Sequence, residues 1–215
     1  MKKAVVLLSG GLDSTVNIFR ASRELNVVLA VTFNYGQRAF INEKAAAQKI
    51  CKILNIPHRV VDVEWFKEFT QTSLVNIENE VPTEQVKIDD LNASQESAKA
   101  VWVPNRNGIF LNIAAGFAEG LGAQYVIPGF NKEEAATFAD NSASFMHALD
   151  ASFAFSTQNG VQVKCYTTDL DKTAIVGLGR SLGIDMDLIW PCYFSGTASC
   201  GKCESCLRFK RACQS

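Results

Sequence analysis

The sequence predicts an α/β fold, a doubly wound and mostly parallel five-stranded sheet with a small C-terminal metal-binding appendage. Short apolar runs rich in β-branched residues alternate with helical patterns, and this alternation is typical of parallel strands joined by crossover helices. A glycine-rich loop follows the first apolar run, and a group of cysteines lies near the end of the chain. A length of 215 residues suits one compact domain with an appendage.

The first half of the chain is predicted to supply three strands, at residues 4–8, 27–33 and 59–63. Ser14 or Asp13 is placed to cap a helix that reaches about Leu25. A second helix is expected over residues 42–54, before a proline interrupts the pattern. The polar segment 64–103 has weak periodicity, and we interpret it as an insertion or a long active-site loop.

The second half is predicted to complete the sheet. Order resumes at Asn107, because apolar residues recur at helical spacing from residue 109 to residue 121. The remaining predicted elements are strands at residues 125–128 and 161–166, and helices at residues 145–155 and 172–182. We therefore assign residues 1–188 to the α/β domain and residues 189–215 to the cysteine-rich appendage.

Composition narrows the function classes. The chain is 47% hydrophobic and 20% charged, which allows a full core. Its formal net charge is -1, with acids and bases interleaved. A protein that holds nucleic acid through phosphates usually shows a basic excess, so a large nucleic-acid partner is disfavoured. The apolar run after the first lysines is too short for a secretion signal, and no run approaches the ~20 residues of a membrane span. We therefore expect a cytoplasmic protein without a membrane partner.

The loop after the first strand has the composition of an anion site. Its residues are Leu8, Ser9, Gly10, Gly11, Leu12, Asp13, Ser14 and Thr15. It lies between a strand and a helix, at the sheet edge where doubly wound folds bind ligands. Adjacent glycines let backbone N–H groups close around a phosphate, and the helix dipole adds to the attraction. Asp13 would repel a phosphate unless a divalent cation lay between them, so it implies Mg²⁺. The plain alternative is a tight turn with a serine cap.

The C-terminal cysteines have the spacing of a metal site. Cys192 is followed by two overlapping Cys-x₂-Cys pairs that comprise Cys200, Cys203 and Cys206. Structural Zn²⁺ takes four tetrahedral ligands, and such pairs provide the required bite. Four thiolates would close the coordination sphere, so the predicted role is structural. Two alternatives stay open, namely buried or redox-active cysteines and an iron–sulfur cluster.

Several strings of residues match one family. In chain order they are residues 9–14, Phe33-Asn34-Tyr35-Gly36-Gln37-Arg38, Val103-Pro104-Asn105-Arg106-Asn107, Gly129-Phe130-Asn131, Lys172, Cys192-Tyr193 and the terminal cysteines with Arg208. On these strings the chain resembles the 7-cyano-7-deazaguanine synthases, the nitrile-forming enzymes of queuosine and deazapurine biosynthesis. The match runs nearly end to end. The first loop alone marks the wider ATP pyrophosphatase superfamily, whose fold is adenine-nucleotide hydrolase-like.

The resemblance implies a two-round reaction on 7-carboxy-7-deazaguanine. ATP adenylates the carboxylate with loss of pyrophosphate, and ammonia displaces AMP to give an amide. A second ATP adenylates the amide oxygen, and loss of AMP leaves the nitrile. The resemblance also implies Zn²⁺ in the cysteine tail and a homodimer.

Residue roles follow from the same resemblance. Residues 8–15 would hold the ATP phosphates, and Arg106, Asn107 and Asp140 would contact substrate. The catalytic candidates are Asp13, Arg38, Arg106 and Lys172. Among these, Arg38 and Lys172 are candidates to stabilise the pentavalent phosphorus. In contrast, we interpret the acidic side chains of Glu43, Glu133 and Glu134 as solvated helix or loop charges.

One segment departs from the family pattern. Many members carry Tyr-Pro-Asp-Cys-Arg after the fourth strand, whereas residues 138–142 here read Phe-Ala-Asp-Asn-Ser. The departure bears on recognition of the deazapurine rather than on adenylation. Three rival functions are an adenylating enzyme that modifies tRNA, a noncatalytic nucleotide-binding module and a zinc-finger nucleic-acid binder. Release of pyrophosphate from ATP separates the enzymes from the binding modules.

Overall fold

A parallel sheet forms the centre of the molecule. The computed structural model describes residues 1–70, 72–76, 78, 79, 81, 83 and 100–214. The strands are β1 (Lys3–Leu7), β2 (Asn26–Asn34), β3 (His58–Asp62), β4 (Tyr125–Ile127) and β5 (Gln162–Val163). Their order is β3-β2-β1-β4-β5, and each neighbouring pair is parallel. The predicted doubly wound sheet is confirmed.

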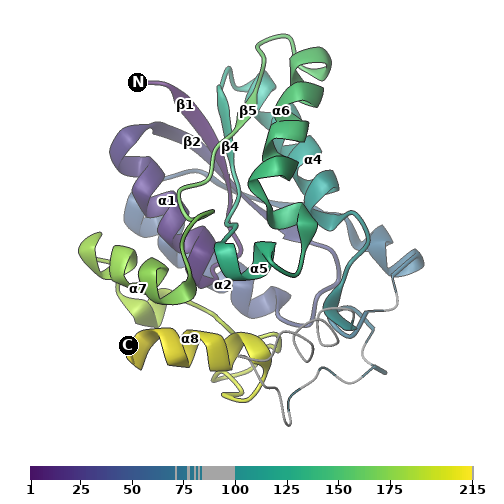
Figure 1. The fold of residues 1–215 in the computed structure, drawn as a ribbon, viewed down its shortest axis with the longest axis vertical. Helices are drawn as coiled ribbons and strands as arrows, with labels where there is room; N and C mark the ends of the chain where they lie inside the picture. Colours follow the sequence, from purple (N-terminus) through teal and green to yellow (C-terminus); the bar gives the residue numbers. More distant parts are fainter. Residues whose placement is uncertain (71, 77, 80, 82, 84–99, 215) are drawn as a thin grey trace.

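Helices cover both faces of the sheet (Figure 1). They are α1 (Leu12–Glu24), α2 (Phe40–Leu54), α4 (Arg106–Gly120), α5 (Lys132–Ala135), α6 (Ala143–Ser156), α7 (Lys172–Ser181) and α8 (Glu204–Gln214). Helices α1 and α2 pack on one face, and α4 and α6 pack on the other. Short 3-10 helices occupy Glu64–Glu68, Ala139–Asn141 and Met186–Leu188.

The alternation of side chains along β1 explains these two layers. Val6 faces a core that contains Ile18 of α1 and Ile50 of α2, whereas Val5 faces a core that contains Leu111 of α4. Successive residues of a strand point to opposite faces, so an unbroken apolar run requires cover on both sides. Ile18, Ile50 and Leu111 are fully buried, and each contributes roughly 1.5–3 kcal/mol through the hydrophobic effect.

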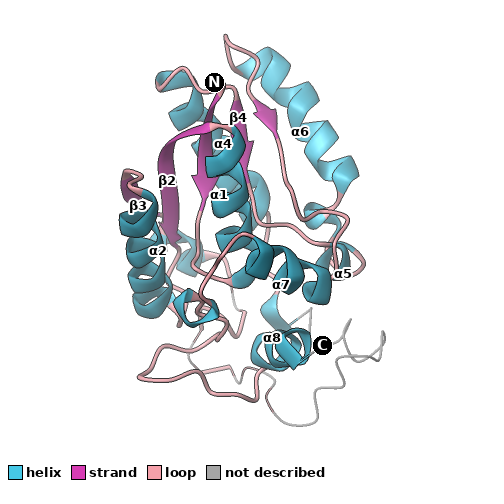
Figure 2. Cartoon of the chain, turned by 90° about the vertical axis from the view of Figure 1, so that its left-hand side faces the viewer, coloured by secondary structure: helices cyan, strands magenta, loops and turns pink. Residues whose placement is uncertain are grey.

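The C-terminal helices lie beyond the carboxyl ends of the strands. Val16 of α1, Ile175 of α7 and Ala212 of α8 share a third apolar cluster. Figures 1 and 2 show α8 at the lower end of the molecule, next to α7 and opposite the N-terminus. The polypeptide therefore returns its C-terminal helix to the edge of the sheet where the glycine-rich loop lies.

Two predicted boundaries differ from the structure for local reasons. Helix α1 has Gly11 as its N-cap and no side-chain cap bond, so the cap predicted at Ser14 or Asp13 is wrong. Strand β5 ends at Val163 rather than at Tyr166. Pro128 follows β4 and has no backbone N–H that could donate to the chain after β5. The Tyr166 N–H donates to the side-chain oxygen of Asn17 at 2.8 Å and not to the neighbouring strand.

The segment 64–103 is described only in part. Its beginning forms the 3-10 helix Glu64–Glu68, and the Ser73 N–H donates to the Ala100 carbonyl at 3.0 Å. Most of the remaining segment lies outside the described residues, and so does that part of the prediction. Within the described part of the chain, the search for a helix long and apolar enough to cross a membrane finds none.

Candidate functional site

The glycine-rich loop is folded around the hydroxyl of Ser14. That oxygen lies 3.1 Å from the Ser9 hydroxyl and donates to the Gly11 carbonyl at 3.2 Å. Gly10 has a φ of 77°, and a Cβ there would lie 2.6 Å from the Cβ of Ala46. Only glycine satisfies both constraints without strain. Because α1 starts at Leu12 with no side-chain cap, its first amides have no acceptor within the helix and suit an anion.

A pocket of about 310 Å³ opens in front of this loop. It lies where the strand order reverses, between the ends of β1 and β4, and this crevice is the usual ligand site of doubly wound sheets. Gly129 follows β4, and a Cβ there would lie 2.6 Å from the Ser14 nitrogen. The two strand ends therefore approach each other closely through a glycine.

The pocket brings together most of the residues predicted for the site. Predicted residues that line it are Leu8, Ser9, Gly11, Leu12, Asp13, Ser14, Arg106, Asn107, Asp140, Lys172 and Cys192. Gly10 is outside the lining and packs against Ala46 of α2, and Thr15 is fully buried within α1. Arg38 does not belong to the lining.

Lys172 is the centre of a buried charge cluster. Its Nζ lies 2.6 Å from Oδ2 of Asp13 and 2.8 Å from Oε1 of Glu134. Burial raises the pKa of Asp13, even though Lys172 opposes this shift. Burial is also the largest effect on Glu134, but the charge and hydrogen bond of Lys172, the Asn131 hydrogen bond and the Arg106 charge together outweigh it and lower that pKa. Lys172 therefore places a positive charge beside Asp13, while Oδ1 of Asp13 has no hydrogen-bond partner among the described residues.

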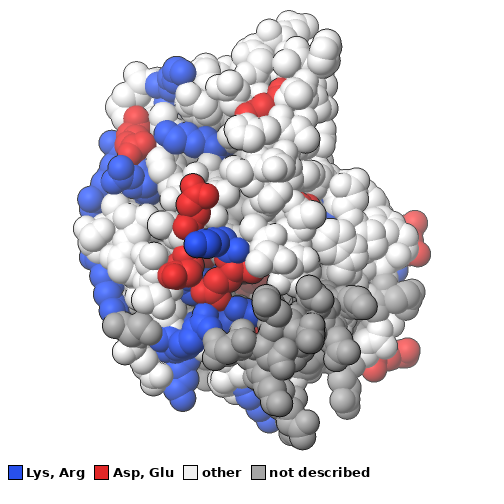
Figure 3. Space-filling view, in the orientation of Figure 1, with Lys and Arg blue, Asp and Glu red and all other residues white. Residues whose placement is uncertain are grey.

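Glu133 links this cluster to the C-terminal helix. One carboxylate oxygen accepts the backbone N–H of Lys172 at 2.9 Å. The other lies 2.7 Å from Arg208 and 2.8 Å from Arg211, both on α8. Figure 3 shows acidic and basic side chains side by side in the middle of this face, in the region where α5, α7 and α8 meet in Figure 1.

A second polar group lies at the start of α4. Arg106 donates to the Tyr35 hydroxyl at 3.4 Å and stacks over its ring at 5.7 Å. Asn107 donates to the Asp140 carbonyl at 3.4 Å. Burial raises the pKa of the Asp140 carboxyl, and the charge of Arg106 opposes this shift. The structure thus places the three predicted substrate contacts on one side of the pocket.

Arg38 has a different surrounding. Its guanidinium donates to the carbonyls of Asn76 at 2.7 Å and Asn79 at 2.5 Å, and it lies 5.8 Å from the ring of Phe194. Its own carbonyl accepts the Ser195 hydroxyl at 2.7 Å. These contacts tie the start of the 64–103 segment to the C-terminal tail and place Arg38 apart from the other catalytic candidates.

The divergent segment 138–142 forms part of the pocket wall. The ring of Phe138 stacks on that of Trp102, with centroids 5.9 Å apart and planes 9° from parallel. Asn141 is buried, and its amide donates to the Asp140 carboxylate at 3.1 Å. Trp102, Phe138 and Asn141 line the pocket together with Asp140. Two of the positions that depart from the family pattern, 138 and 141, therefore belong to the pocket wall.

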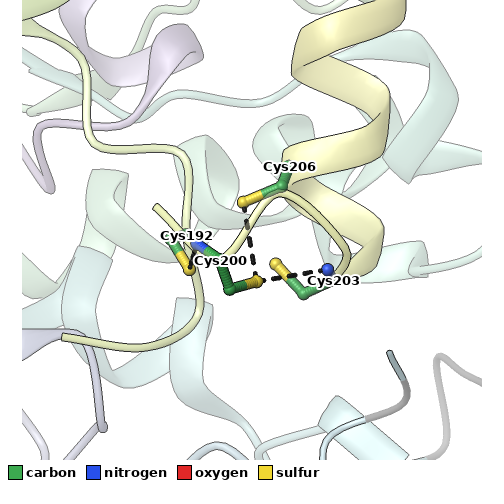
Figure 4. A group of neighbouring side chains, drawn as sticks. All are labelled: Cys192, Cys200, Cys203 and Cys206. Carbon is green, nitrogen blue, oxygen red and sulfur yellow. Dashed lines mark hydrogen bonds between the residues drawn. The ribbon is translucent and has the colours of Figure 1, made fainter. Parts of the chain in front are cut away.

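The four predicted cysteines converge. Figure 4 shows Cys192, Cys200, Cys203 and Cys206 pointing toward one another from the loop before α8 and from its first turn. Their Sγ atoms all lie within 4.8 Å of one another, and tetrahedral ligands at ~2.3 Å from Zn²⁺ would be about 3.8 Å apart. Backbone N–H groups of Phe194 and Cys200 donate to the Cys192 sulfur at 3.4 and 3.3 Å. A hydrogen bond from Cys206 lowers the pKa of Cys203 to about 5 and raises the pKa of Cys206, so Cys203 is the thiolate of this pair. The thiolate is the form that binds metal.

Three acidic side chains were misread from the sequence. Glu43, Glu133 and Glu134 all line the pocket rather than standing as solvated charges. Glu43 accepts a hydrogen bond from Gln37 at 2.8 Å, and burial raises its pKa. Glu133 and Glu134 lie in α5, which follows β4 after a short loop, so their place near the carboxyl edge of the sheet was the available signal. The aromatic wall of Trp102 and Phe138 had no sequence signal, because it depends on two segments that meet only in the fold.

Comparison with known proteins agrees with the resemblance. Residues 3–215 match the family described as "Queuosine biosynthesis protein QueC". The 7-cyano-7-deazaguanine synthase of Bdellovibrio bacteriovorus is 58% identical over 213 residues, covering 98% of this chain and 92% of the relative. The synthase of the same name from Carboxydothermus hydrogenoformans is 50% identical over 212 residues, covering 99% and 98%.

A solved structure of a 4-thiouridine synthetase–RNA complex with bound ATP has a TM-score of 0.51 and 20% identity, covering 99% of this chain and 50% of that one. Identity at that level shows a shared fold only. The family match spans nearly the whole sequence, from the glycine-rich loop to the C-terminal cysteines. The chain belongs to the QueC family of queuosine biosynthesis proteins.

Proposed function

We propose that this chain is a 7-cyano-7-deazaguanine synthase, which converts 7-carboxy-7-deazaguanine and ammonia to the nitrile at the expense of two ATP. The observation that carries the proposal is the convergence of an anion-binding loop, Lys172 and the Arg106 group on one pocket in a chain of this family. ATP fits the loop side, and the planar deazapurine fits the side lined by Trp102 and Phe138.

The reaction needs activation of poor leaving groups. In the first round the substrate carboxylate attacks the α-phosphorus, pyrophosphate leaves, and ammonia then displaces AMP at the carbonyl carbon. In the second round the amide oxygen attacks the α-phosphorus of another ATP and pyrophosphate leaves. Loss of AMP and of the two N–H protons then gives the nitrile. The protein then has to position reactants and stabilise charge on phosphorus, and no nucleophilic side chain is required.

Lys172 is the group best placed to stabilise that charge. An ammonium has three N–H donors, and Asp13 and Glu134 account for two of them. The third is left for a phosphate oxygen. Arg106 and Asn107 at the start of α4 hold the substrate, and the Asp140 carboxylate accepts a hydrogen bond from it. Arg38 takes a positioning role, since its contacts hold the tail and the 64–103 segment together.

Two metal ions belong to this proposal. Zn²⁺ is held by Cys192, Cys200, Cys203 and Cys206, where four thiolates leave no open position and fix the tail 189–215 on the main domain. Mg²⁺ accompanies ATP, and the buried Oδ1 of Asp13 offers it an oxygen ligand. Metal analysis of the purified protein distinguishes one zinc per chain from iron.

We propose further that the protein is a cytoplasmic homodimer without a nucleic-acid partner. Helix α6 offers a surface for pairing, because it carries few charges. Asp150 is its one charged residue, and that carboxylate is already engaged, since it accepts the Val163 N–H at 2.6 Å. Phe155 on the same helix is 94% exposed. Light scattering of the purified chain measures the assembly directly.

The test of the enzyme is pyrophosphate release from ATP and Mg²⁺ with 7-carboxy-7-deazaguanine and ammonium, followed by mass analysis of the product. We expect the nitrile and two pyrophosphates per turnover. Pyrophosphate release without the nitrile would support the adenylating site and would indicate that the divergent 138–142 segment recognises another substrate. No pyrophosphate under any condition would refute the proposal.

A further inference from the structure

We propose that the metal-binding tail is an electrostatic part of the nucleotide site. In this inference Arg208 and Arg211 of α8 neutralise Glu133 and so allow the pocket to accept an anionic triphosphate. The inference rests on the proposed function, because it takes ATP as the ligand. It makes the two arginines positioning residues, which act through a carboxylate and not on the reacting atoms.

The contacts form an unbroken chain from the tail to the phosphate loop. Arg208 and Arg211 both reach the same oxygen of Glu133, at 2.7 and 2.8 Å. The other oxygen of Glu133 accepts the N–H of Lys172 at 2.9 Å. The side chain of Lys172 contacts Asp13 of α1 at 2.6 Å. Each link is a charge-assisted hydrogen bond, which is among the stronger polar contacts in proteins.

The charge balance shows what the tail contributes. Within the main domain, the described cluster has three carboxylates, those of Asp13, Glu133 and Glu134, and one ammonium, that of Lys172. Such an excess of negative charge repels a triphosphate at short range. The tail adds Arg208 and Arg211, together with Glu204, which lies 2.8 Å from Arg208. The tail therefore brings net positive charge to carboxylates that line the pocket.

The metal site sets the position of these arginines. Helix α8 begins directly after Cys203 and contains Cys206 in its first turn. Arg208 lies two residues beyond that ligand, and its side chain is only 15% exposed. The Cys203 carbonyl accepts the Leu207 N–H at 3.0 Å. A cation bound by the four thiolates would thus fix the start of the helix that carries both arginines.

The test separates neutralisation of charge from simple tethering. Binding of a nonhydrolysable ATP analogue with Mg²⁺ is measured by calorimetry for R208Q, E133Q and the double variant, after the metal content of each is checked. R208Q should raise the Kd roughly tenfold, equivalent to about 1.4 kcal/mol. E133Q should lower the Kd, because it removes a negative charge. The double variant should return to within about twofold of the wild type, since it removes one charge of each sign.

A tethering role predicts the opposite pattern. E133Q would then weaken binding as R208Q does, and the double variant would not recover; either result would overturn the inference. R211Q provides a second test if R208Q does not fold, with a smaller increase in Kd because Arg211 is more exposed, at 33%. An unchanged Kd in R211Q would also count against the inference.

Arg180→Gln is the matched control. Arg180 of α7 also contacts α8, through the Cys213 carbonyl at 2.7 Å, but it does not contact the carboxylate cluster. Its loss should leave the Kd unchanged, and a tenfold increase there would refute the charge argument. If the wild type binds no ATP analogue, the proposed function fails; if the wild type binds it and R208Q binds equally well, only this inference fails.

Discussion

Replacing Lys172 by methionine tests the buried charge cluster most directly. The side chain of Lys172 is 10% exposed and pairs with Asp13, at 14%, and Glu134, at 38%. Methionine keeps most of the volume and removes the charge, so two carboxylates lose their cation. Removing one partner of a buried ion pair costs about 3–5 kcal/mol. Because Glu134 is partly solvated, we expect a loss near the lower limit, about 3 kcal/mol at pH 8.

The loss should depend on pH. In the wild type the lowered pKa of Glu134 adds stability above its unfolded pKa, and this is lost as pH falls through the folded value. In K172M burial, the largest effect on both carboxyls, is no longer opposed by Lys172. We expect both pKa values to rise above their unfolded values of about 4, with Asn131 and Arg106 still opposing the rise at Glu134. The folded variant then takes up protons first, so its stability increases as pH falls from 8 to 5. The gap between variant and wild type should narrow over that range.

Urea unfolding at both pH values measures this gap, and Lys164→Met is the matched control. Lys164 is 36% exposed and lies 3.4 Å from Glu24, so its replacement should cost at most ~1 kcal/mol. Adding E134Q to K172M should recover part of the loss, because it removes one of the unpaired charges. A K172M loss that equals the K164M loss, or one that stays constant from pH 8 to pH 5, would refute the reasoning.

Three further predictions concern the loop, the tail and the assembly. Gly129→Ala should abolish ATP binding in calorimetry, because its Cβ would lie 2.6 Å from the Ser14 nitrogen; Gly177→Ala, with open space around it, should bind normally. Cys200→Ser should lose the bound metal in elemental analysis and raise the Kd for ATP as R208Q does, whereas full metal content would contradict the assigned ligand set. Phe155→Asp should convert the proposed dimer to a monomer in light scattering, and an unchanged mass would exclude the α6 surface.

Only the fold explains why Lys172 pairs with Asp13, a predicted site residue, and with Glu134, which the sequence indicated as a solvated charge. Asp13, Glu134 and Lys172 come from α1, α5 and α7, and they meet because β1 and β4 are neighbours in the sheet. Apart from its place shortly after β4, the local sequence of Glu134 is that of a solvated helix charge. Arg38 shows the reverse case, since its position in a matching string suggested catalysis while its contacts hold two loops.

The sequence by itself determined the features that depend on local pattern. Apolar runs of the right length specify the parallel strands, adjacent glycines specify the loop after β1, and the Cys-x₂-Cys spacing specifies the metal-type cluster. Tertiary structure alone decided the features that depend on distant partners. These are the pairing of Lys172, the contact of Glu133 with α8, and the aromatic wall of Trp102 and Phe138. Whether a charged or aromatic side chain is solvated or buried depends on which elements pack beside it, and strand order sets that packing.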